Sequence, residues 1–237
     1  MKLSIILPAY HEGENLDILL PKIRETMIGL TDEYEILVVD ALECTDSTKS
    51  AASANNAVYL NRGNDDYYGS AVRTGIKYAK FEKIMFMDSD GSHSPSYIKT
   101  LLEYADEYDI VIASRYTESG ENENNFVLVF ISLVLNLVYS KLFNLNVKDV
   151  SNSFKIYNRS DLKSLTLTCN HFDIIEEILI KIVLKNPKTK IKEIPILFKK
   201  RMFGKSKRNF FVFVFSYMKT LVRLFKYKVD FKKENHL

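Results

Sequence analysis

Residues 86–93, FMDSDGSH, place two aspartates directly behind a short apolar run. Apolar runs of this length are typical of strands buried inside a parallel sheet. The chain contains five of them, separated by stretches that are compatible with helices. Strands that alternate with helices predict an α/β fold with a doubly wound, mostly parallel sheet. The predicted strands are 3–8, 34–39, 57–60, 83–87 and 109–113, and the predicted helices are 13–29, 46–54, 69–80 and 95–107.

Polar residues that directly follow these strands are the candidates for a binding site, because ligands of a doubly wound sheet bind beyond the carboxyl ends of the strands. Asp88 and Asp90 flank one residue, and alternate side chains of an extended segment share a face. Two carboxylates on one face can bind one hard cation, so the sequence predicts a Mg²⁺ or Mn²⁺ site that carries substrate phosphates. The other candidates are 9–12 (AYHE), Asp40 and 114–116 (SRY).

Two other acidic motifs fit this stretch less well. An EF-hand loop has its glycine at position 6, whereas Gly91 falls at position 4. The haloacid-dehalogenase phosphatases also place a DxDG motif after a strand, but there the motif opens the domain. Here about 80 residues precede it, and no pair of adjacent aspartates follows to hold magnesium. His93 is interpreted as a structural residue of the turn.

The composition indicates a chain that folds by burial, since 46% of its 237 residues are hydrophobic. Cys44 and Cys169 match no metal-binding or redox spacing and are expected to be free thiols. The apolar run before Pro8 is too short for a secretory signal, so we expect the protein on the cytoplasmic side of a membrane. Residues 199–237 hold twelve Lys/Arg against two Asp/Glu and form a basic end on an acidic body.

Residues 126–143 predict an apolar helix with one charged side chain, Lys141. Ser132, Asn136 and Ser140 recur every four residues and form one polar stripe, which favours a helix that lies on a surface. That surface is either the protein core or the bilayer interface. The length also reaches the lower limit for a membrane span, which stays an alternative.

A second amphipathic helix is predicted at 209–228. Its basic polar face and aromatic apolar face are typical of a helix bound at a membrane interface. Nucleic acid would pair with the charge but not with so many phenylalanines, so no nucleic-acid partner is expected. The predicted polar face is Ser216, Lys219, Thr220, Arg223 and Lys226, and the apolar face is Phe211, Val214, Phe215, Met218, Leu221, Val222 and Phe225.

Several segments in order resemble the family-2 inverting glycosyltransferases, which have the GT-A fold. The later segments are similar to the branch that contains dolichyl-phosphate mannose synthases and other polyprenyl-phosphate glycosyltransferases. The resemblance covers about residues 1–207. Its segments are LSIILPAYHEGENL (3–16), VVD ending at Asp40, TDST (45–48), GSAVRTGIKYA (69–79), MDSDGSHSP (87–95), ASRY (113–116), DVSNSFKIYNR (149–159), EEIL (176–179) and EIPILFKKRMFGKSK (193–207).

The resemblance implies a role for each matching residue. Asp88 and Asp90 would hold the metal on the donor diphosphate, and the catalytic set would be Asp90, Arg115, Arg201 and Glu177. The acceptor phosphate would bind Arg115, Arg201, Ser206 and Lys207. A nucleotide sugar, with GDP or UDP, would bind Pro8, Ala9, Tyr10, Glu12, Asp40, Gly69, Arg73, Asp88 and Ser89.

The sequence also departs from the family at positions that bear on the acceptor. Basic residues that relatives carry near the 126–143 helix are Leu128 and Leu133 here, and a family glycine is Ser153. A polyprenyl phosphate needs no general base, because its dianion is already a nucleophile. A hydroxyl acceptor would need a carboxylate such as Glu177 to take its proton. A membrane-bound protein that binds nucleotide sugars without turnover is a further alternative.

The predicted organisation is a GT-A domain at 1–207, which includes the interfacial helix 126–143, and a basic amphipathic tail at 208–237. Together these features predict a metal-dependent glycosyltransferase that docks on the membrane surface as a peripheral or monotopic protein.

Overall fold

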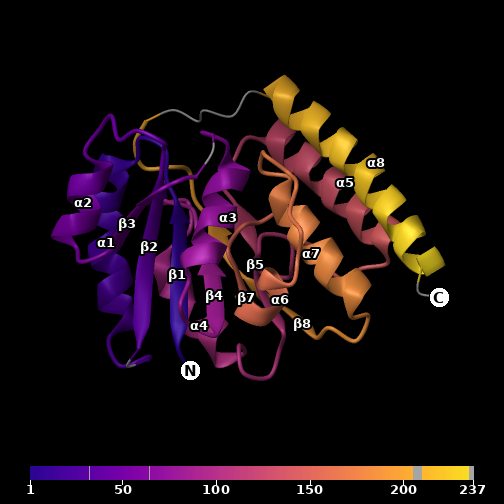
Figure 1. The fold of residues 1–237 in the computed structure, drawn as a ribbon, viewed down its shortest axis with the longest axis horizontal. Coiled ribbons are helices and arrows are strands. Elements are labelled where there is room, and N and C mark those ends of the chain that lie inside the picture. The colour runs from indigo at the N-terminus through magenta and orange to yellow at the C-terminus, as the bar shows by residue number, and fades with distance from the viewer. Residues whose placement is uncertain (32, 64, 205–209, 235–237) are drawn as a thin grey trace.

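The computed structural model describes residues 1–237 except 32, 64, 205–209 and 235–237. Within these residues one seven-stranded sheet has the order β3-β2-β1-β4-β7-β5-β8 and carries helices on both faces (Figure 1). The strands of this sheet are β1 Leu3–Pro8, β2 Tyr34–Asp40, β3 Val58–Asn61, β4 Lys83–Phe86, β5 Ile110–Ser114, β7 Lys155–Asn158 and β8 Ile191–Pro195. A small separate pair is formed by β6 Glu121–Asn122 and β9 Leu197–Phe198.

The helices follow the strands as the sequence predicts, with shifts of a few residues at their ends. The predicted helix at 95–107 is shorter in the structure, where a 3₁₀ turn at Pro95–Tyr97 leads into α4. The helices are α1 Gly13–Met27, α2 Thr48–Ala54, α3 Tyr68–Tyr78, α4 Ile98–Glu103, α5 Phe126–Phe143, α6 Arg159–Lys163, α7 Ile174–Lys185 and α8 Phe210–Glu234.

The sheet is parallel except at β7, which runs antiparallel between β4 and β5. All six residues of β1 are buried, as expected for a strand covered by helices on both faces. The doubly wound, mostly parallel sheet predicted from the apolar runs is therefore confirmed. β7, β8 and the β6–β9 pair were not among the predicted strands.

Alternate side chains of each strand enter two separate apolar cores. Ile6 and Phe86 pack with residues of α3, α7 and α8, whereas Leu7 and Met85 pack with residues of α1 and α4. This division follows from the two-residue period of a strand. Both cores hold the carboxyl ends of β1 and β4 in place, which positions the residues directly after them.

Helices α5 and α8 lie side by side outside α7 (Figure 1). The hydroxyl of Tyr139 on α5 donates to the carbonyl oxygen of Tyr217 on α8 at 3.0 Å, and Lys228 donates to the carbonyl oxygen of Leu142 at 2.6 Å. Tyr217 and Leu224 are buried in the core. The described part of the predicted tail thus packs on the body of the protein, while the division at residue 207 stays a prediction.

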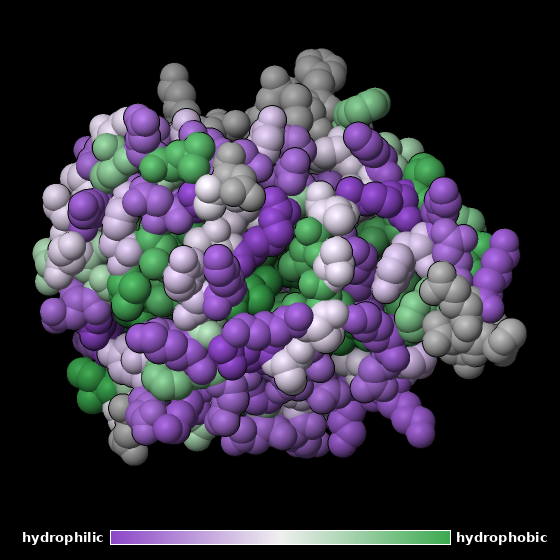
Figure 2. All heavy atoms as spheres, in the orientation of Figure 1, coloured by the Kyte–Doolittle hydropathy of each residue, from purple (hydrophilic) through white to green (hydrophobic). Residues whose placement is uncertain are grey.

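The polar stripe of α5 faces the protein. Asn136 is buried, and its side-chain oxygen accepts from the backbone N–H of Ser151 at 2.9 Å. The outward residues of α5 are mostly apolar and exposed, among them Phe130, Leu133 and Leu137. Figure 2 shows hydrophobic side chains among hydrophilic ones along the margin where α5 and α8 lie.

The predicted faces of α8 need a correction. Ser216 and Thr220, expected on a solvated polar face, are buried, and the Thr220 hydroxyl donates to Asp173. The tertiary contact explains the error, because a small polar side chain can pack against the body once it has a hydrogen-bond partner. The apolar residues Phe215, Met218, Val222 and Phe225 are exposed, which is compatible with the face predicted for a membrane interface. The side chains of Phe211 and Val214 lie outside the described residues.

Candidate functional site

Asp88 and Asp90 lie directly beyond β4, and the turn that carries them is held by hydrogen bonds. The backbone N–H of Asp88 donates to Nδ1 of His93 at 3.0 Å, and Oδ1 of Asp88 accepts from the Ser153 hydroxyl at 2.7 Å. Oδ1 of Asp90 accepts from the backbone N–H of Ser92 at 3.0 Å. One oxygen of each carboxylate is therefore used to hold the turn.

The other oxygen of each aspartate is left for a ligand. Among the described residues, Oδ2 of Asp88 lies 4.0 Å from Nδ1 of His93, and Oδ2 of Asp90 lies 3.9 Å from Nη1 of Arg201. Both aspartates line both of the cavities described below. Carboxylate oxygens that are oriented and not yet engaged fit a hard divalent cation. The pair expected to bind the metal thus has suitable chemistry for it.

A cavity of about 460 Å³ lies over the part of the sheet that is formed by the N-terminal half of the chain. It contains the predicted donor residues that follow β1 and β4. Aromatic side chains form another part of its wall, and Tyr68 stacks on Phe172 with ring centroids 4.3 Å apart. The lining residues are Pro8, Ala9, Tyr10, Glu12, Arg62, Asp66, Tyr67, Tyr68, Asp88, Ser89, Asp90, His171, Phe172 and Arg201.

A second cavity, of about 550 Å³, meets the first at Asp88, Asp90, Phe172 and Arg201. One end is cationic, with Lys199, Lys200 and two arginines. The other end runs along α5 and is largely apolar. Its remaining lining residues are Ser92, Arg115, Asn122, Asn124, Leu128, Ile131, Ser132, Leu135, Ser151, Asn152, Ser153, Ile175, Phe198, Gly204 and Tyr217.

Arg201 stands between the two cavities and pairs with Glu12. Its Nη2 lies 2.7 Å from both carboxylate oxygens of Glu12, and its Nε donates to the carbonyl oxygen of Phe203 at 2.7 Å. Burial raises the pKa of Glu12 above its ordinary value, although Arg201 partly offsets the effect. The predicted donor residue and the predicted phosphate-binding residue therefore contact each other directly.

Arg115 lines the larger cavity but is neutralised by a buried partner. Its guanidinium makes two hydrogen bonds to Asp149, at 2.8 and 2.7 Å, and one to the hydroxyl of Ser151 at 2.9 Å. Burial alone would raise the pKa of Asp149, but the Arg115 guanidinium holds it below its ordinary value. The pair closes the loop after β5 onto the segment before β7, so a role for Arg115 at the acceptor phosphate stays a prediction.

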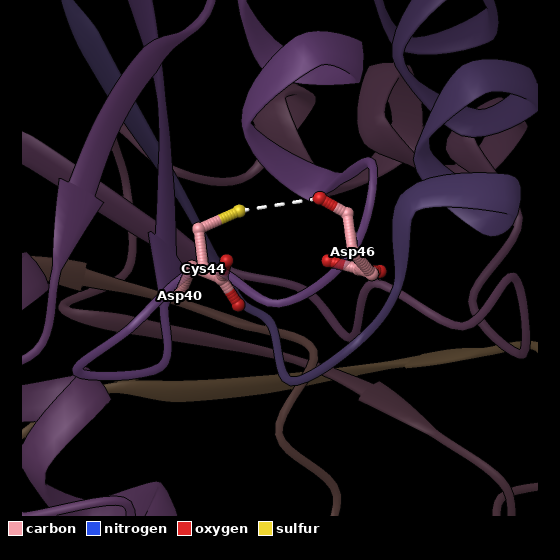
Figure 3. A group of neighbouring side chains, drawn as sticks. All are labelled: Asp40, Cys44 and Asp46. Atoms are coloured by element: carbon pink, nitrogen blue, oxygen red, sulfur yellow. Dashed lines mark hydrogen bonds between the residues drawn. The ribbon is translucent and has the colours of Figure 1, made fainter.

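Asp40 ends β2 and belongs to a small group with Cys44 and Asp46 (Figure 3). Asp40 is buried, and one of its oxygens accepts from the hydroxyl of Tyr59 at 3.0 Å. Asp40 is absent from the residues that line either cavity, so its expected contact with the donor stays a prediction.

Asp46 joins the starts of two helices. Its carboxylate accepts the backbone N–H groups of Gly13 and Thr48, each at 3.0 Å. Partial burial would raise the pKa of Asp46, but these hydrogen bonds outweigh burial and lower it. Because both of its oxygens already accept hydrogen bonds, Asp46 serves to hold α1 against α2.

Gly69 and Arg73 line neither cavity and instead support the site through the loop at Cys169 and Asn170. A Cβ atom on Gly69 would lie 2.2 Å from the carbonyl oxygen of Cys169, so only glycine allows this close approach. Arg73 donates to the same carbonyl oxygen at 2.5 Å and to the side chain of Asn170 at 3.2 Å. Both residues, predicted to bind the donor, fix the loop that brings His171 and Phe172 to the smaller cavity.

The prediction for Glu177 needs a correction. The side chain is fully buried and lines neither cavity, so it is neither a surface acid nor a base within reach of substrate. Its carboxylate accepts the backbone N–H groups of Thr168 and Cys169 and pairs with Lys181 at 2.8 Å. Burial would raise the pKa of Glu177, but these partners lower it. It is a structural anion that fixes the loop before α7.

His93 has the structural role expected from its position in the turn. It is fully buried, and its Nε2 lies 2.8 Å from the side-chain oxygen of Asn152 while Nδ1 accepts from Asp88. Both cysteines are free thiols, as expected. Ser206 and Lys207 lie outside the described residues, so their expected contacts with phosphate stay predictions.

Sequence reasoning missed several residues of the site. Arg62, Tyr68 and Phe172 line the smaller cavity, and Lys199 and Lys200 line the larger one. The two lysines offered a signal, because they directly precede Arg201 within the matched segment. Phe172 offered none, since only the packing of its loop against α3 brings it to the strand ends.

Comparison with known proteins agrees with this architecture. The family model "Glycosyl transferase family 2" matches residues 4–166. Dolichol-phosphate mannosyltransferase of Pyrococcus furiosus is 32% identical over 96% of the chain, which spans 65% of that relative's length. Undecaprenyl-phosphate mannosyltransferase of Micrococcus luteus is 28% identical, with 88% of each chain covered.

Solved structures share the fold at low identity. Glucosyl-3-phosphoglycerate synthase from Mycobacterium tuberculosis, in complex with Mn²⁺, UDP-glucose and phosphoglyceric acid, superposes with a TM-score of 0.76 at 17% identity, covering 95% of this chain and 80% of that one. The same enzyme with Mg²⁺ and UDP gives 0.72, at 17% identity over 94% and 79% of the two chains. The GT-A type of the fold is thereby confirmed. From its sheet, the site at the strand ends and the match to the family model, the chain belongs to glycosyltransferase family 2.

Proposed function

We propose that the protein transfers a sugar, with inversion, from a GDP- or UDP-sugar to a polyprenyl phosphate at the cytoplasmic surface of a membrane. The observation that carries this proposal is the pair of cavities that meet at Asp88, Asp90 and Arg201. One cavity is formed by strand ends and aromatic side chains. The other joins a cationic end to an apolar wall along α5, which matches a phosphate with a hydrocarbon chain.

The smaller cavity takes the donor. The backbone and side chains after β1 and the aromatic residues Tyr10, Tyr67 and Tyr68 surround the nucleoside, and Asp88 and Asp90 would hold Mg²⁺ or Mn²⁺ on the diphosphate. A bound divalent cation supplies positive charge for the departing nucleoside diphosphate. The M. tuberculosis enzyme, which shares the fold, is solved with Mn²⁺ and UDP-glucose and with Mg²⁺ and UDP, which supports a divalent cation and a nucleotide sugar here.

The larger cavity takes the acceptor phosphate through Lys199 and Lys200. Arg115 and Arg201 are already paired with Asp149 and Glu12, whereas within the described residues neither lysine side chain has an ion-pair partner. These two lysines can supply the positive charge that relatives place near α5, where this chain has leucines. Leu128, Ile131 and Leu135 then contact the first isoprenoid units.

The carboxylates along this cavity also favour a phosphate acceptor. Within the described part of the chain, Asp88 and Asp90 are the acidic residues that line it, and both are assigned to the metal. A hydroxyl acceptor would need a further carboxylate to take its proton. A phosphate dianion attacks without one, so the residues present suffice for this acceptor.

The exposed apolar faces of α5 and α8 support a position of the cavity at the bilayer surface. Among the described residues α5 is the helix long and apolar enough to span a membrane by length and composition, and 17% of it is buried. Its polar stripe contacts the protein, so we propose that α5 lies in the interface rather than crossing it. Lys219 and Lys226, both exposed on α8, would contact anionic headgroups.

The test is product analysis with radiolabelled UDP- and GDP-sugars, Mg²⁺ or Mn²⁺, and undecaprenyl or dolichyl phosphate. We expect a chloroform-soluble product that mild acid cleaves and that Arg201→Ala no longer forms. Phosphoglyceric acid serves as a soluble acceptor in a parallel reaction. Transfer to soluble hydroxyl acceptors alone would overturn the lipid-phosphate proposal and leave the assignment as a glycosyltransferase intact.

A further inference from the structure

Among the described residues, the hydroxyl of Ser153 donates the shortest hydrogen bond to the Asp88 carboxylate. Its Oγ donates to Oδ1 of Asp88 at 2.7 Å, across 65 residues of sequence, and Ser153 is 7% exposed. Tyr68 also approaches this oxygen, but at 3.5 Å, which is the limit of a hydrogen bond. Ser153 lines the larger cavity, so it lies beside the carboxylate rather than over the donor.

The segment that carries Ser153 is fixed on both sides. Its neighbour Asn152 donates to the carbonyl oxygen of Ala113 at 2.6 Å and contacts Nε2 of His93 at 2.8 Å. His93 in turn accepts the backbone N–H of Asp88 at 3.0 Å. Asp88 is therefore held at its main chain through His93 and at its carboxylate through Ser153, and both supports converge on one rigid segment before β7.

We propose that Ser153 is a positioning residue for the metal, one that acts through Asp88 without binding the cation itself. A hydrogen bond to Oδ1 fixes the rotation of the carboxylate and leaves Oδ2 to bind the cation. Hydrogen bonds to metal ligands typically change metal affinity by about 10- to 100-fold. The inference rests on the metal site of the proposed function and adds the residue that orients it.

The experiment measures Mn²⁺ binding to the purified full chain, by electron paramagnetic resonance of free Mn²⁺ and by calorimetry, alone and with UDP or GDP. In Ser153→Ala we expect the dissociation constant for Mn²⁺ to rise about tenfold. Ser153→Thr keeps a hydroxyl and should retain most of the affinity. Ser160→Ala on α6 is the control, because this exposed serine lines neither cavity.

Turnover gives an independent readout. Ser153→Ala should raise the Mn²⁺ concentration needed for half-maximal activity more than it lowers the rate at saturating Mn²⁺. A purely structural role would lower thermal stability and leave Mn²⁺ affinity within twofold of wild type, and that result would overturn the inference. A wild-type protein that binds no Mn²⁺ under any of the three conditions would instead overturn the proposed metal site, and with it the role of Ser153.

Discussion

The two cavities that meet at Asp90 are built in different ways. The smaller one takes its charged and backbone groups largely from residues just beyond β1 and β4, where short contiguous motifs supply neighbouring side chains. The larger one collects residues from separate segments between Asp88 and Tyr217, including helices α5, α7 and α8 and several loops. The comparison teaches that the smaller cavity follows from local strand ends, whereas the larger cavity depends on how distant segments pack.

The largest effect should come from Asp90, which is one of the residues that line both cavities. Asp90→Asn keeps the hydrogen bond from Ser92 but halves the charge available to the cation, and losing one such transition-state contact typically costs about 10²- to 10³-fold in rate. We expect a loss in that range and no Mn²⁺-dependent binding of the nucleoside diphosphate by calorimetry. Glu103→Gln, which removes an exposed charge on α4, is the control. Unchanged metal-dependent affinity in Asp90→Asn would refute the metal assignment.

A smaller effect should distinguish the function of the larger cavity from that of the smaller one. Lys199→Ala combined with Lys200→Ala removes two exposed cations that line the larger cavity and have no ion-pair partner among the described residues, and exposed ion pairs contribute about 0.2–1 kcal/mol each. The KM for the polyprenyl phosphate should rise by up to about tenfold, while donor affinity by calorimetry stays within twofold. Lys99→Ala with Lys163→Ala controls for net charge. Equal losses in donor and acceptor binding would show that the two cavities are not functionally distinct.

The exposed apolar faces of α5 and α8 can be tested with substitutions at residues that line neither cavity. Leu133→Glu with Val222→Glu places two charges on the exposed faces of α5 and α8, where both side chains are more than 40% exposed. Binding to vesicles that contain anionic lipid, measured by flotation, should fall by about tenfold because each charge resists burial in the interface. Thr26→Glu with Ser50→Glu on the far side is the control. Protein that stays with the membrane after alkaline carbonate would indicate that α5 spans it.

The smallest effect concerns α7, which supports the acceptor side through two adjacent glutamates. Burial raises the pKa of Glu176 to about 8 from an ordinary value of 4.5. The folded protein thus keeps a proton that the unfolded chain has released, and stability should fall as pH rises from 4.5 to 8. Burial lowers the pKa of Lys155 to about 8 from an ordinary value of 10.5, so its contribution makes stability rise with pH only between those two values and does not change between pH 4.5 and 8.

Chemical denaturation at pH 5 and pH 8 measures this difference. In Glu176→Gln the loss of stability between the two pH values should shrink, because the substituted side chain carries no titrating proton. Glu177→Gln should destabilise the protein by about 3 kcal/mol at pH 7, since it leaves the buried Lys181 without its charge partner. The same pH slope in wild type and Glu176→Gln would contradict the assignment of Glu176 as the titrating group.

Much of the framework was predictable from the sequence alone. The apolar runs located five of the seven strands of the large sheet, and the position of Asp88 and Asp90 beyond one of them predicted where the site lies. The strand prediction succeeds because a strand buried on both faces has a local hydrophobic signature. The site location stays a prediction, which rests on parallel strands bringing their carboxyl ends to one edge. The family was also evident from motifs that are contiguous in sequence.

The roles of individual charged and polar residues were decided only by the tertiary structure. Glu177 matches a family position, yet it is buried on α7, where the loop at Thr168 and Cys169 donates to its carboxylate and Lys181 pairs with it. Ser216 and Thr220 have the pattern of a solvated face, yet α8 packs them against the body. In the sequence, Ser153 is a departure from the family pattern. In the structure, its hydroxyl donates a hydrogen bond to Asp88. Hydrophobic periodicity reports which face of an element is buried, but the partner of a polar group comes from a distant segment and leaves no trace in the local pattern.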